Sequence, residues 1–113
     1  MSKYLISFPS DAMVVPDAEL PQVVADSHAV VREAKAAGVW VFGGGIDETV
    51  APVRVEGSGA VLPGAYASAH PMTGGFTVLE APSRDVALEW AARFAAACRC
   101  PQEVRRFGDD AES

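Results

Sequence analysis

The sequence predicts an α+β fold of the ferredoxin-like kind, a split β-α-β arrangement with an inserted β-hairpin. Two segments carry apolar residues every three or four positions, as amphipathic helices do, and shorter apolar runs of strand length surround them. The predicted order is strand, helix, strand, hairpin, strand, helix, strand. Right-handed crossovers in this order place both helices on one face of a single sheet, so the other face is left uncovered.

The first strand and the first helix are predicted in the first third of the chain. Residues 3–8 form the strand, which Pro9 ends. An apolar stripe then predicts a helix over residues 19–37, with Asp17 as the candidate N-cap and Gly38 as the C-terminal stop. The stripe consists of Leu20, Val23, Val24, Val31, Ala34 and Ala37.

The second strand is the stretch VWVF, which three glycines follow. Alternation with period two predicts Val39 and Val41 on one face of the sheet and Trp40 and Phe42 on the other. Glycines at 43–45 allow the chain to bend, or allow a neighbour to approach where a side chain would intrude.

The second half of the chain supplies a hairpin, a strand, a helix and a last strand. Residues 53–62 alternate on both sides of a short glycine loop, which is typical of a β-hairpin, and residues 76–80 form the next strand. Ser83 is the predicted N-cap of the second helix, and residues 102–107 form the closing strand. The apolar stripe of the second helix is Val86, Trp90, Phe94 and Cys98.

The composition is that of one globular domain. We assign residues 1–108 to this domain and residues 109–113 to an acidic tail. The start makes a poor signal peptide and no apolar run reaches membrane-spanning length, so we expect a cytoplasmic protein that does not contact membranes. The formal net charge of −6 disfavours nucleic acid as a partner.

The sequence predicts neither a cofactor nor a metal. FGGG is not followed by a helix, as a dinucleotide-binding loop requires. The spacing of Cys98 and Cys100 fits neither a disulfide framework nor a zinc module, and Cys98 is expected in the core. Arg99, Arg105 and Arg106 near the C-terminus are expected to be solvated rather than to bind an anion.

The uncovered face of the sheet predicts a homodimer. Both faces of VWVF are apolar, so a monomer would expose a larger apolar patch than soluble proteins usually carry. Burying about five such side chains is worth on the order of 10 kcal/mol, comparable with the roughly 4 to 15 kcal/mol that association costs. We therefore expect the sheets of two copies to pack together in a dimer.

Two histidines are candidates for proton transfer near neutral pH. His28 lies at the rim of the first apolar stripe, either as a structural histidine or as a general base at the mouth of a cleft. Consecutive helical residues point about 100° apart, so Asp26, Ser27 and His28 cannot form a relay. His70 shares a loop with Tyr66 and is either a ligand contact or part of a solvated turn.

The later part of the chain resembles the YCII-related family, in particular its branch named for a DGPF motif. The resemblance covers about residues 28–107, and its most specific pieces are GGF at 74–76 and ALEWAAR at 87–93. It implies a small dimeric α/β-barrel protein. The signature corresponds to Pro63-Gly64-Ala65-Tyr66, which keeps the glycine and an aromatic residue. The resemblance to more distant members of the family implies a histidine in the first helix that is paired with an aspartate. His28 lies near the position of that histidine, and no aspartate in this sequence matches its partner.

Three functions remain open. The first is a module that binds a small molecule. If this module is an enzyme, it catalyses an acid–base or lyase-like step with His28 as the general base. Its cleft is expected to be lined by His28, Trp40, Tyr66 and His70. The second is a non-catalytic regulatory protein, because the resemblance to DGPF-type proteins implies a partner in an extracytoplasmic-function sigma factor system. The third is a stable dimer whose pocket has no function.

Overall fold

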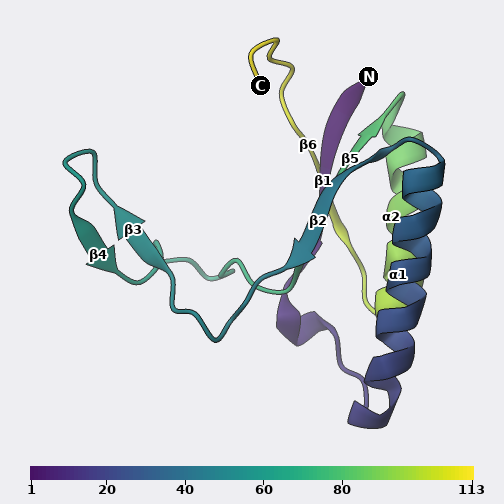
Figure 1. Cartoon of the computed structure of the whole chain (residues 1–113), viewed down its shortest axis with the longest axis horizontal. Coiled ribbons are helices and arrows are strands. Elements are labelled where there is room, and N and C mark those ends of the chain that lie inside the picture. The colour runs from purple at the N-terminus through teal and green to yellow at the C-terminus, as the bar shows by residue number, and fades with distance from the viewer.

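The computed structural model describes residues Met1–Ser113 as two layers, a four-stranded sheet with two helices on one of its faces (Figure 1). The strand order is β2-β5-β1-β6, and every neighbouring pair is antiparallel. This is the strand order of a split β-α-β fold, so the predicted α+β class is confirmed. No helix combines the length and the apolar character that crossing a bilayer requires.

The elements follow the predicted order along the chain. The sheet consists of β1 (Ser2–Phe8), β2 (Trp40–Gly45), β5 (Gly75–Ala81) and β6 (Glu103–Arg106). The helices are α1 (Leu20–Ala36) and α2 (Arg84–Cys98), and the inserted hairpin is β3 (Val53–Val55) and β4 (Val61–Pro63). Two 3-10 turns, η1 (Ser10–Ala12) and η2 (Asp17–Glu19), lead from β1 into α1.

The helix ends agree with the sequence at two of the three positions that it named. Ser83 caps α2, since its hydroxyl accepts a hydrogen bond from the Val86 amide at 3.2 Å. Gly38 ends α1 with a φ of +78°. The prediction that Asp17 is the N-cap of α1 is wrong. Asp17 begins η2, and its carbonyl accepts a hydrogen bond from the Leu20 amide. The 3-10 turn η2 therefore leads directly into α1, which begins without a side-chain cap.

Strand β2 departs from regular alternation. Trp40 pairs with Leu79 and Phe42 pairs with Val78, so Val41 is an extra residue that bulges out of the ladder. Trp40 keeps the helix-covered face and packs against the core, whereas Val41 and Phe42 are both exposed. The predicted alternation is therefore wrong beyond Trp40. The glycines do not bend the chain away, because residues 43–45 continue the strand.

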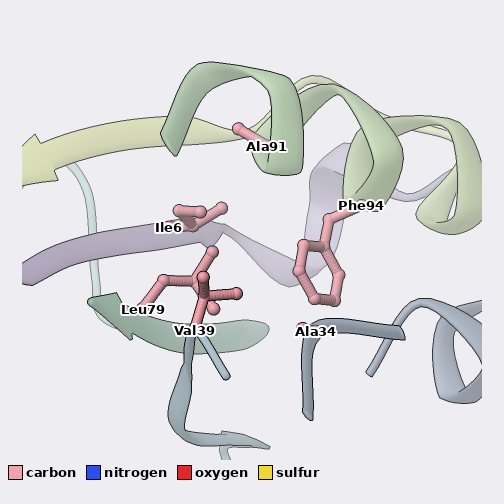
Figure 2. Close-up of a cluster of buried hydrophobic side chains, with 6 residues drawn as sticks. All are labelled: Ile6, Ala34, Val39, Leu79, Ala91 and Phe94. Atoms are coloured by element: carbon pink, nitrogen blue, oxygen red, sulfur yellow. The ribbon is translucent and has the colours of Figure 1, made fainter. Parts of the chain in front are cut away.

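The main hydrophobic core joins both layers at one end of α1 (Figure 2). Ala34 of α1 is fully buried between the sheet and α2, and its methyl group allows the helix to lie close to the strands. The cluster consists of Ile6, Ala34, Val39, Leu79, Ala91 and Phe94. It depends on the small residues of both helices as much as on its large side chains.

Residues 46–74, which we call the arm, project from the helix-free side of the sheet and carry the hairpin (Figure 1). The radius of gyration is 15.7 Å, against about 13 Å for a compact chain of this length. The two ends of the arm meet where the Ile46 amide donates to the Gly74 carbonyl at 2.8 Å. The arm is thus an insertion between two strands that are neighbours in the sheet.

The first glycine of the run is needed for a close approach. A Cβ at Gly43 would lie 2.5 Å from Cη2 of the Trp40 indole and 3.2 Å from the Phe76 carbonyl oxygen, whereas a Cβ at Gly44 would meet nothing nearer than 3.9 Å. We expect Gly43→Ala to lower the free energy of unfolding by about 1–3 kcal/mol through overpacking. The matched Gly44→Ala variant should change it by less than about 1 kcal/mol. Urea titration checks this, and equal effects at the two positions would contradict it.

Candidate functional site

A cavity of about 940 Å³ lies between α1 and the sheet. Its walls come from α1 between Leu20 and Lys35, from the ends of β1 and β2, from the start of β5, and from α2. Three glycines of β2 and two before and at the start of β5 leave the backbone bare on the sheet side. The volume is within the range of small-molecule sites, about 300–1,000 Å³.

The first part of the apolar stripe of α1 faces this cavity, whereas Ala34 near the end of the helix belongs to the filled core. Leu20 and Val24 line the cavity and are 40% and 49% exposed, whereas Ala34 is 0% exposed. The periodicity correctly predicted which side of the helix faces the sheet. Burial along the stripe is uneven, because Val23 is buried whereas Leu20 and Val24 on either side of it remain open to the cavity.

Aromatic rings form much of the remaining wall. Trp40, Phe94 and Phe8 line the cavity, and the centroids of the Trp40 and Phe94 rings lie 6.5 Å apart. Lys35 Nζ lies 5.8 Å from the Trp40 ring centroid, a cation–π geometry. The Phe8 ring covers Gly75, where a Cβ would lie 2.8 Å from Cε1. Trp40 is thus placed at the cavity as the sequence predicted.

His28 lines the cavity from α1, and no carboxylate holds it. The neighbouring Asp26 accepts from Arg99 Nη2 at 2.8 Å and from Gln22 Nε2 at 2.7 Å. These hydrogen bonds, that from Arg99 first, lower the pKa of the Asp26 carboxyl. The Ser27 hydroxyl donates to the Val24 carbonyl at 3.0 Å. The structure therefore offers a single histidine at the cavity and no relay.

The comparisons with known proteins identify the family. The YCII-related domain family matches residues 3–103. The chain belongs to the YCII-related family. The matched residues extend further towards the N-terminus than residues 28–107, on which the sequence resemblance rested. In a separate comparison, no curated protein matches the chain.

One solved structure supports the fold of this YCII-related protein. The chain is similar to 5-chloro-2-hydroxyhydroquinone dehydrochlorinase, TftG, from Burkholderia phenoliruptrix AC1100, solved in complex with 2,5-dihydroxybenzoquinone. The TM-score is 0.51, with 19% sequence identity over 97% of each chain. At this identity the likeness shows the common fold.

The arm places the other two predicted site residues elsewhere. Tyr66 is 84% exposed, and neither Tyr66 nor His70 is among the residues that line the cavity of this YCII-related chain. The His70 amide donates to the Ser68 hydroxyl at 3.0 Å, which closes a local turn. A single chain therefore brings His28 and Trp40 together and leaves Tyr66 and His70 apart from them.

Sequence reasoning missed two cavity residues, Arg32 and Lys35. They line the cavity with His28, and the three positions are spaced by four and then three residues on α1. That spacing places side chains on one face of a helix. The signal was present in the sequence as a polar, basic stripe beside the apolar one.

Cys98 lines the inner end of the cavity in the form of a thiol. Burial raises its pKa from 9.0 to about 11, and the nearby Cys100 contributes to the rise. A thiolate is the reactive form of cysteine, so Cys98 is a poor nucleophile at neutral pH. Both cysteines are free and buried, and for Cys98 this burial agrees with the predicted place in the core.

We expect Cys98 in the folded protein to react with a disulfide reagent at pH 8 roughly a hundredfold more slowly than in urea, because the raised pKa removes thiolate. Stopped-flow labelling with Ellman's reagent measures this, with Cys100→Ser used to isolate Cys98. Labelling of the native protein as fast as that of the unfolded chain would contradict it.

Proposed function

We propose that this protein binds a small organic molecule in the cavity between α1 and the sheet, and that His28 transfers a proton to or from that molecule. The cavity itself carries the proposal, because its volume is about 940 Å³, aliphatic and aromatic side chains form much of its lining, and His28 lies on the wall that α1 provides. The structural neighbour gives further support, as TftG was solved with a small cyclic molecule and is a dehydrochlorinase.

A lyase-like step is the chemistry that His28 supports best. The neutral imidazole would take a proton from a carbon of the ligand. The electrons of that C–H bond would form a double bond, and a leaving group would depart with its bonding pair from the adjacent carbon. This needs one base and no cofactor. Cys98 is less suited to covalent catalysis near neutral pH, because burial raises the pKa of its thiol and so lowers the population of the thiolate.

The binding proposal is tested with 2,5-dihydroxybenzoquinone, the molecule bound by the neighbour, as the probe. We expect the probe to raise the melting temperature by mass action and to quench the fluorescence of Trp40. Trp90→Phe serves as the background, since Trp90 does not line the cavity. Absence of both effects would contradict binding of this class of molecule, and would favour a regulatory protein without a ligand.

Once a substrate is found, His28→Ala is expected to reduce turnover by about 10²–10⁴-fold, the usual contribution of a general base. Binding of the substrate should be retained. His70→Ala in the same assay tests the other predicted histidine, and a loss there would place the arm of a partner at the ligand.

We further propose that the protein is a homodimer, in which a second copy covers the helix-free face of the sheet. Phe42, Val78 and Leu5 lie in one row across β2, β5 and β1, and Phe42 is 65% exposed. The arm adds exposed apolar side chains at Val53, Val55, Val61 and Met72. Each side chain of this size is worth about 2 kcal/mol when buried, so several together offset the cost of association.

Sedimentation equilibrium at low micromolar concentration is expected to give twice the chain mass of 11.8 kDa. Phe42→Asp should shift the protein to monomer, because it places a charge in the buried row. Val14→Asp is the matched control, since Val14 is 84% exposed and lies between the two 3-10 turns. A wild-type monomer would contradict the proposal.

A further inference from the structure

The ligand of the cavity is, we infer, an anion carried on a ring, such as an aromatic carboxylate, whose charge is bound by Arg32 and Lys35. This inference rests on the proposed function and names the chemical class of its ligand.

The charges that line the cavity are opposite to those of the chain as a whole. The chain has fifteen acidic and nine basic residues, with a net charge of −6. No aspartate or glutamate lines the cavity, whereas Arg32, Lys35 and His28 all do. Within a surface that repels anions at long range, α1 therefore provides a local region that attracts them.

The two cations at the cavity also lack the partners that most other cations have. Each of Lys3, Arg93, Arg99, Arg105 and Arg106 forms an ion pair with a carboxylate. Arg32 and Lys35 form none, although they lie three residues apart and repel each other slightly. A bound anion would relieve this repulsion and provide the missing acceptor.

The aromatic walls of the cavity indicate which kind of molecule carries the negative charge of the ligand. Trp40, Phe94 and Phe8 present flat apolar surfaces to the cavity, and the Lys35 ammonium lies beside the Trp40 ring. A ligand ring can pack on these walls while its anionic group reaches the rim. His28 lies one helical turn from Arg32, so it faces the same end of such a ligand.

Two probes with the same ring separate charge from shape, namely a naphthalene carboxylate and the corresponding naphthalene carboxamide. Isothermal titration calorimetry on the full chain is expected to show the carboxylate binding at least about tenfold more tightly at low salt. The double variant Arg32→Gln, Lys35→Gln should remove this preference. Arg84→Gln is the matched control, because Arg84 has no ion pair and lies outside the cavity.

The outcomes distinguish the inference from the proposed function. Equal affinity for the two probes, or a preference that survives in the double variant, would overturn the anionic ligand and leave a binding cavity in place. Failure of both probes to bind, with unchanged Trp40 fluorescence, would overturn both. Circular dichroism checks that the double variant is folded. If the double variant does not fold, the single variant Lys35→Gln replaces it, and a partial loss of the preference for the carboxylate is expected.

Discussion

The site depends on the way α1 is held by α2 rather than by the sheet. Ion pairs join the helices at Asp26 with Arg99, 2.8 Å apart, and at Glu33 with Arg93, 3.1 Å apart. Only near its C-terminal end, at Ala34, is α1 fully packed against both layers. Towards its start α1 lines the cavity, which is the space that remains between the helix and the strands. A residue larger than alanine at position 34 would displace α1, and with it the wall of the cavity that α1 forms.

Much of the fold could be predicted because its signals are local. Apolar periodicity, the Ser83 cap and the Gly38 stop each act within a few residues, and all the predicted elements are present. What the sequence did not show depends on contacts between elements. The bulge at Val41 results from the register between β2 and β5, and the start of α1 is determined by the turn before it rather than by Asp17.

The site was predictable only in part, for a related reason. His28 and Trp40 belong to elements whose faces follow from periodicity, so both could be placed at the cavity. Tyr66 and His70 lie in a loop, and loops often carry function, but the local sequence does not determine where that loop lies in the folded chain. Arg32 and Lys35 share the periodicity of His28, and a basic stripe of three positions is easily taken for a solvated face.

The hydrogen bond between Ile46 and Gly74 has an evolutionary consequence. It closes the base of the arm, so the four-stranded sheet is complete without any residue between these two positions. None of residues 47–73 lines the cavity, and only Glu48 and Thr73 at the ends of this segment accept hydrogen bonds from Ser10 of the scaffold. Substitutions and changes of length between residues 49 and 72 can therefore accumulate among homologues without altering the strand ladder or the lining of the cavity.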